Sequence, residues 1–92
     1  MGVEDQNLSG AVLSRLRDAE AGKTEALYNL GLLYSTGNQV ELNYVEAHKW
    51  FNLAALRGLK RAVIDREELA HDMSALEIAE AQRQARQWLA AH

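Results

Sequence analysis

An internal repeat with a period of 36 residues constrains the fold of this chain more than any other feature of the sequence. Glycine or apolar residues recur at this offset at five pairs of positions: Gly22 and Gly58, Ala19 and Ala55, Ala26 and Ala62, Leu27 and Val63, and Leu33 and Leu69. Repeats of this length are typical of solenoids, in which each unit is a pair of helices and neighbouring units share one core. We therefore predict an all-α chain of stacked antiparallel helices.

The composition favours long helices joined by short turns. The chain has 92 residues, no proline and six glycines, and 48% of its residues are hydrophobic. Proline interrupts helices, so its absence leaves the helical pattern unbroken. A chain of this length forms one domain with a modest core. We expect a single helical-repeat domain over residues 8–92, preceded by a flexible lead-in at residues 1–7.

Periodic apolar residues and helix-capping residues divide this domain into about five helices and no strands. The expected helices begin near Leu8, Thr24, Asn43, Lys60 and Ser74. Thr24, Asn43 and Ser74 are expected to be N-caps. A glutamate stands three residues after Asn43 and three residues after Ser74, which predicts a capping box at both helix starts.

The fifth helix, at about residues 74–90, is interpreted as a C-terminal capping helix. Its expected inward face is apolar and consists of Ile78, Ala81, Ala85, Trp88 and Leu89. A terminal helix with one apolar and one polar face can cover the last exposed part of a solenoid core. We expect Trp88 and Ile78 to cover it.

The residues of the central unit resemble those of a known family. The pattern consists of Ala26-x-x-x-Leu30-Gly31-x-x-Tyr34, a turn at Gly37 and Val40, Ala47-x-x-Trp50-Phe51, Ala54-Ala55 and Gly58. This pattern resembles the Sel-one-like repeat (SLR), a relative of the tetratricopeptide repeats. The resemblance implies a short right-handed α-solenoid. It would have one full repeat at about residues 26–62, flanked by half repeats and closed by the capping helix.

The sequence departs from the family pattern at three positions that bear on the fold. Gln39 stands where the turn usually has a second glycine. Arg66 and Glu67 occupy the positions equivalent to Leu30 and Gly31. We expect Gly31 to lie where two helix backbones pass closely, and Glu67 does not fit such a place. The series of repeats is therefore expected to stop at the fourth helix.

The sequence features that could indicate an enzyme or a metal site are weak. There is no cysteine, and His48, His71 and His92 have no second histidine at the helical spacing that chelation requires. His71, Asp72 and Ser74 are close in sequence, but catalytic groups usually converge from separate segments, and Ser74 has a capping role. We expect no catalytic residues, no metal site and no cofactor.

Charge and hydropathy argue against nucleic acid and membranes as partners. The net charge is −3 and the basic residues are scattered, whereas nucleic-acid binding requires clustered lysine and arginine. No apolar stretch approaches the length of a membrane span. The first residues do not form a secretion signal, so the cytoplasm is the default expectation for the location.

Candidate binding residues lie outside the apolar core stripe. Tyr28 and Leu32 are one helical turn apart, and the 36-residue offset relates Tyr28 to Ile64. In the SLR family the first helix of each pair lines the concave surface, so the resemblance implies a binding spot there. Its expected apolar centre and polar rim are Tyr28, Leu32 and Ile64, with Asn29, Arg61, Asp65 and Glu68. An apolar centre with a polar rim concentrates binding energy. The alternative is that a neighbouring helix buries these residues.

The resemblance implies a non-enzymatic protein–protein interaction module, an adaptor that binds a peptide or a partner domain on its concave face. Many members of the family are bacterial, and the helix around residues 78–82 is similar to a bacterial C-terminal ending. Two other functions stay open. The low number of repeats suits a homodimeric scaffold that continues the stack between chains. A small hydrolase is the least favoured, and the identity of any partner is left open.

Overall fold

Residues 9–92 fold into five helices and the connections between them. The computed structural model describes residues 9–92, and no strand occurs among these residues. The helices are α2 (Gly10–Glu20), α3 (Thr24–Thr36), α4 (Tyr44–Leu56), α5 (Lys60–Ala70) and α6 (Ala75–Ala91). The predicted all-α fold with five helices is confirmed. The predicted lead-in at residues 1–7 and the predicted helix start at Leu8 lie outside the described residues.

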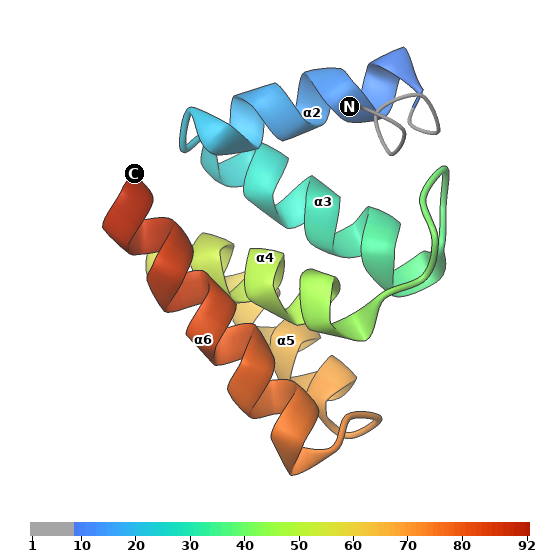
Figure 1. Cartoon of the computed structure of the whole chain (residues 1–92), viewed down its shortest axis with the longest axis vertical. Helices are drawn as coiled ribbons and strands as arrows, with labels where there is room; N and C mark the ends of the chain where they lie inside the picture. The colour runs from blue at the N-terminus through green and yellow to red at the C-terminus, as the bar shows by residue number, and fades with distance from the viewer. Residues whose placement is uncertain (1–8) are drawn as a thin grey trace.

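The helix α4 is the centre of the arrangement. It packs against α3, α5 and α6, whereas α2 packs against α3. Figure 1 shows α2, α3 and α4 as successive layers, with α5 and α6 on opposite sides of α4. The α6 helix, the predicted cap, therefore lies on the central helix of the stack.

Two groups of buried apolar side chains hold these layers together. The first joins α2, α3, α4, α5 and α6 and includes Leu27, Leu30, Trp50 and Trp88. The second joins α4, α5 and α6 and includes Phe51. Alanines without any exposed surface lie at the helix contacts: Ala19, Ala47, Ala54, Ala62 and Ala81. Their small size lets the helices approach closely, which explains why the sequence repeat contains so many alanines.

The helix starts follow the predictions in part. At α6 the Ser74 hydroxyl accepts from the Glu77 N–H at 3.1 Å and the Glu77 carboxylate accepts from the Ser74 N–H at 2.8 Å, so this predicted capping box is confirmed. At α4 the Asn43 side chain accepts from the Glu46 N–H at 3.1 Å. The carboxylate of Glu46 accepts instead from the Trp50 indole N–H at 3.0 Å. The Asn43 N–H donates to the Tyr34 carbonyl at 3.0 Å, so the box at α4 is only half formed.

Thr24 was expected to be the N-cap of α3, and this expectation is wrong. Lys23 occupies the N-cap position without a side-chain cap hydrogen bond, and Thr24 is the first helical residue. The extended backbone of Lys23 begins the helix directly after Gly22, which has a φ of +83°. The backbone geometry at this turn therefore shifts the start by one residue.

The packing around Gly31 explains why this position of the repeat is a glycine. A Cβ atom at this position would collide with the ring of Phe51. The sequence led us to expect a close passage of two backbones. The close approach is instead between the α3 backbone and an aromatic side chain of α4. In the following turn Gln39, at the position of the family's second glycine, adopts a φ of +65°.

The α6 helix buries Ala81, Ala85 and Trp88. Trp88 is buried and its ring lies edge-on to that of Trp50, with the centroids 6.2 Å apart. The Trp88 ring also stacks on His92, which contacts Glu20 at the end of α2. Leu89 was expected to point inward, but 46% of its surface is exposed. One residue advances a helix by about 100°, so Leu89 leaves the face on which Ala85 and Trp88 lie.

Candidate protein-binding groove

The helices α3 and α5 lie along the same face of α4, and their first halves are joined by side chains. Arg61 donates to the carboxylate of Glu25 at 2.7 Å, across the 36-residue offset of the repeat. One turn further, the Tyr28 hydroxyl donates to the carboxylate of Asp65 at 2.6 Å. These two contacts bridge the two helices at their N-terminal ends.

Tyr28 is held by interactions on three sides. Its ring is tilted by 42° against the Phe51 ring, with the centroids 5.6 Å apart. The Arg61 guanidinium lies 4.8 Å from the Tyr28 ring centroid. The hydrogen bond to Asp65, together with partial burial, raises the pKa of Tyr28 above its ordinary value of 10.0. The hydroxyl therefore stays protonated and remains a donor to Asp65.

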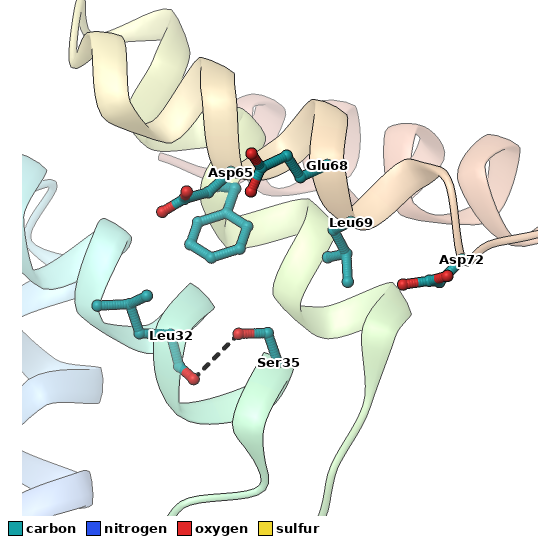
Figure 2. Close-up of a pocket in the computed structure, with 7 residues that line it drawn as sticks. Leu32, Ser35, Asp65, Glu68, Leu69 and Asp72 are labelled. Carbon is teal, nitrogen blue, oxygen red and sulfur yellow. Dashed lines mark hydrogen bonds between the residues drawn. The ribbon is translucent and has the colours of Figure 1, made fainter.

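The second halves of α3 and α5 leave a hollow of about 280 Å³ between them. We call it the α3–α5 groove and define it by its lining residues: Leu32, Ser35, Phe51, Asp65, Glu68, Leu69 and Asp72. Figure 2 shows Leu32 and Ser35 on α3, facing Asp65, Glu68 and Leu69 on α5 and Asp72 in the turn that follows α5. Phe51 from α4 completes the lining. The groove thus has apolar surface from three helices and carboxylates along one wall.

The charged groups of α5 are divided between its two sides. Asp65 and Glu68 line the groove, together with Asp72 after the helix end. Arg66 turns away from the groove and donates to the Asn52 side chain on α4 at 2.7 Å. No lysine or arginine lines the groove. The groove wall is therefore acidic although α5 itself contains both signs of charge.

The structure brings five of the seven predicted binding residues to this groove or its closed end. Leu32, Asp65 and Glu68 line it, and the pair formed by Tyr28 and Arg61 closes its N-terminal end. Of the three apolar residues, Tyr28 is half-buried by its contacts, whereas Leu32 is 37% exposed and Ile64 is 57% exposed.

The remaining two predicted residues lie apart from the groove lining. Asn29 lines a different hollow, between α2 and α3, together with Arg15 and Leu32. Ile64 is on α5 but is not among the residues that line the groove. Leu32 is thus shared by both hollows, and Ile64 extends the exposed apolar surface of α5.

Four residues of the groove were not identified as binding residues from the sequence: Ser35, Phe51, Leu69 and Asp72. Phe51 and Leu69 appeared only as core positions. Asp72 follows Asp65 by seven residues and Glu68 by four, and this helical spacing is the signal that could have placed all three carboxylates on one face. For Ser35 we find no comparable signal.

Residues 9–92 were also searched for a metal site, a buried titratable group and a membrane-spanning helix. Within residues 9–92, no group of three or more histidine, cysteine, aspartate or glutamate side chains could hold a metal ion. His48 is buried on α4, and burial and the nearby charge of Arg66 lower its pKa below the ordinary 6.5. None of the helices in residues 9–92 combines the length and the apolar character that crossing a membrane requires.

Comparison with known proteins identifies the repeat. Residues 24–59 match the family model of the Sel1 repeat. The matched segment contains α3, the following turn and α4. The resemblance found in the sequence is therefore confirmed. Comparison with curated proteins and with solved structures gave no significant match.

Proposed function

We propose that this chain, a Sel1-like repeat protein, is a non-enzymatic interaction module that binds a peptide or a partner domain on the face formed by α3 and α5. Sel1 repeats suggest protein–protein interaction in general. The proposal adds the binding face, and with it an adaptor role in which the repeat frame presents that face to a partner.

The α3–α5 groove is the observation that carries this proposal. Its apolar residues Leu32, Phe51 and Leu69 belong to three different helices, so the packing of the repeat fixes their relative positions. Leu32 and the neighbouring Ile64 are exposed in the chain. An exposed apolar surface bordered by polar groups is the kind of patch that interacting proteins bury on binding.

The two exposed apolar residues provide the test. The double substitution Leu32→Ser and Ile64→Ser removes apolar surface without touching the contacts of Tyr28. Short random peptides displayed on phage are selected on the wild-type protein, and binding of the selected peptides is then measured on the variant by fluorescence anisotropy. We expect the wild-type protein to select peptides and the variant to lose roughly tenfold or more in affinity, because interface energy is concentrated in a few apolar contacts.

A matched control removes the same kind of surface elsewhere. Leu56 and Leu76 are also exposed, and neither lines the groove. The double substitution Leu56→Ser and Leu76→Ser should leave peptide affinity unchanged. Circular dichroism must show equal helicity for all three proteins. If L32S/I64S binds the peptides as well as the wild type does, the proposed face is wrong.

A further inference from the structure

We propose that the α3–α5 groove selects partner segments that present a basic side chain, arginine or lysine, to the carboxylates of Glu68 and Asp72. The inference rests on the proposed function, because it names the class of partner that the same groove accepts. Three features of the groove carry it: the state of its carboxylates, the direction of the two helices and the character of its floor.

The carboxylates on the α5 side have no basic neighbour in the groove. Among residues 9–92, no hydrogen bond or ion pair involves the side chains of Glu68 or Asp72, whereas Asp65 is held by the Tyr28 hydroxyl. Arg61 and Arg66, the basic residues of α5 nearest to this wall in sequence, pair with Glu25 and Asn52 instead. The negative charge of the wall is therefore available to a partner.

The helix directions add to this charge. Contacts run in the same order along both helices, from Glu25 and Arg61 through Tyr28 and Asp65, so α3 and α5 are parallel. The groove consequently lies at the C-terminal turns of both helices. Neither last turn contains a basic residue. The C-terminus of a helix carries partial negative charge and favours a cation, so two helix ends act in the same direction as the carboxylates.

The groove floor suits the remainder of a basic side chain. Lysine and arginine have hydrocarbon stems that cover apolar surface while the charged end reaches polar groups. Leu32 and Leu69 offer apolar surface beside the carboxylates. The hollow, about 280 Å³, is at the small end of ligand sites and matches one long side chain better than a larger ligand. An acidic partner segment would meet like charges on the same wall.

The experiment compares the peptides selected by three proteins. The display library is selected in parallel on the wild-type protein, on the variant Glu68→Lys with Asp72→Lys, and on the control Glu41→Lys with Glu67→Lys. Both variants change the net charge equally, but Glu41 and Glu67 do not line the groove. Selected peptides are then titrated by fluorescence anisotropy at low and high salt.

We expect the wild type and the control to enrich arginine or lysine at one peptide position, and E68K/D72K to lose this enrichment. The affinity of an enriched peptide should fall roughly tenfold or more for E68K/D72K and less than about twofold for the control. High salt should weaken wild-type binding, because it screens the charges.

The other outcomes separate this inference from the proposed function. Peptides that bind the wild type without basic enrichment, or that keep it on E68K/D72K, overturn the inference. In that case the loss of binding in L32S/I64S still supports the proposed face. A library that yields no binder for the wild-type protein overturns both.

Discussion

The helices α3 and α5 are equivalent in the repeat but differ in their surroundings. The α3 helix lies between α2 and α4, whereas α5 packs on α4. The buried residues of α3 are Ala26, Leu27, Leu30, Gly31 and Leu33, and those of α5 are Ala62 and Leu69. The two residues that remain buried in α5 face α4. In α3, other residues also face α2, and within residues 9–92 α5 has no equivalent neighbouring layer.

The two positions at which the repeat fails show this difference most directly. Leu30 is fully buried, and its equivalent Arg66 donates to Asn52 at the edge of α4. Gly31 accommodates the Phe51 ring, and its equivalent Glu67 is exposed. At both pairs of equivalent positions, the residue in α3 is packed in the core and the residue in α5 is polar. The α3 helix therefore buries more side chains than α5, and α5 supplies two of the three carboxylates in the lining of the α3–α5 groove.

The largest expected effect contrasts Leu30 with Arg66. Leu30→Ala should lower the free energy of unfolding by about 2–5 kcal/mol, because it removes a fully buried side chain and leaves a cavity. Arg66→Ala should lower it by only about 1 kcal/mol, the net value of one partly exposed hydrogen bond. Urea denaturation followed by circular dichroism measures both. Equal losses at the two positions would mean that α5 is packed as fully as α3.

The second contrast uses the pair Gly31 and Glu67. Gly31→Ala should lower the free energy of unfolding by about 1–3 kcal/mol, because the added methyl group overlaps the Phe51 ring. Glu67→Ala should change it by less than about 0.5 kcal/mol, as expected for an exposed helix position. Urea denaturation again gives the comparison.

Gly10 supplies the control for this substitution. A Cβ atom there meets no other atom within 4 Å. Gly10→Ala should therefore be neutral or slightly stabilising, since alanine is the better helix former. If Gly31→Ala were equally harmless, the Phe51 ring could not be held against α3 as the structure shows.

The sequence predicted the frame of this molecule better than its groove. Periodic apolar residues located the five helices, and the 36-residue offset corresponds to the register in which Glu25 meets Arg61. Such patterns separate buried from exposed positions. They do not show where a residue at the edge of the core also borders a surface groove. Phe51 is 2% exposed, so it reads as core, yet it also lines the groove.

Tyr28 shows a second limit of the sequence. Its spacing from Leu32 indicated an exposed apolar patch. Whether its hydroxyl reaches Asp65 depends on the separation of α3 and α5, which α4 sets by packing against both. The spacing of apolar residues along the sequence predicts which face of a helix is buried, but it does not predict the distance between two helices that are not adjacent in sequence.

A smaller effect is expected from the contact that joins α3 to α5. Tyr28→Phe removes the hydrogen bond to Asp65 and should lower the free energy of unfolding by about 1 kcal/mol. The ring contact with Phe51 is retained. Tyr44→Phe is the matched control, because no hydrogen bond of the Tyr44 hydroxyl occurs among residues 9–92, and it should be neutral. An equal loss in both variants would assign the effect to the hydroxyl in general and not to the bridge between the helices.

The smallest expected effect is a loss of stability on acidification that comes from His48 on α4. This loss is absent at neutral pH. His48 is buried, its Nδ1 atom has no hydrogen-bond partner among residues 9–92, and burial and Arg66 lower its pKa below 6.5. Between that lowered pKa and 6.5 the unfolded chain binds more protons than the folded chain, so the stability that neutral His48 contributes is present above pH 6.5 and is lost as the pH falls.

Substitution of His48 isolates this term from the rest of the titration. His92 titrates in the opposite sense, because its bond to the Trp88 carbonyl and the nearby Glu20 raise its pKa, so its contribution is lost as the pH rises. The comparison of His48→Leu with the wild type removes the His92 term, which both share. Thermal unfolding at about pH 7.5 and pH 5.5 should show a smaller loss on acidification for His48→Leu. An unchanged pH dependence in His48→Leu would show that the packing of α4 against α5 tolerates a protonated His48. The boundary between the buried core and the polar surface would then lie between α4 and α5 and not within α4.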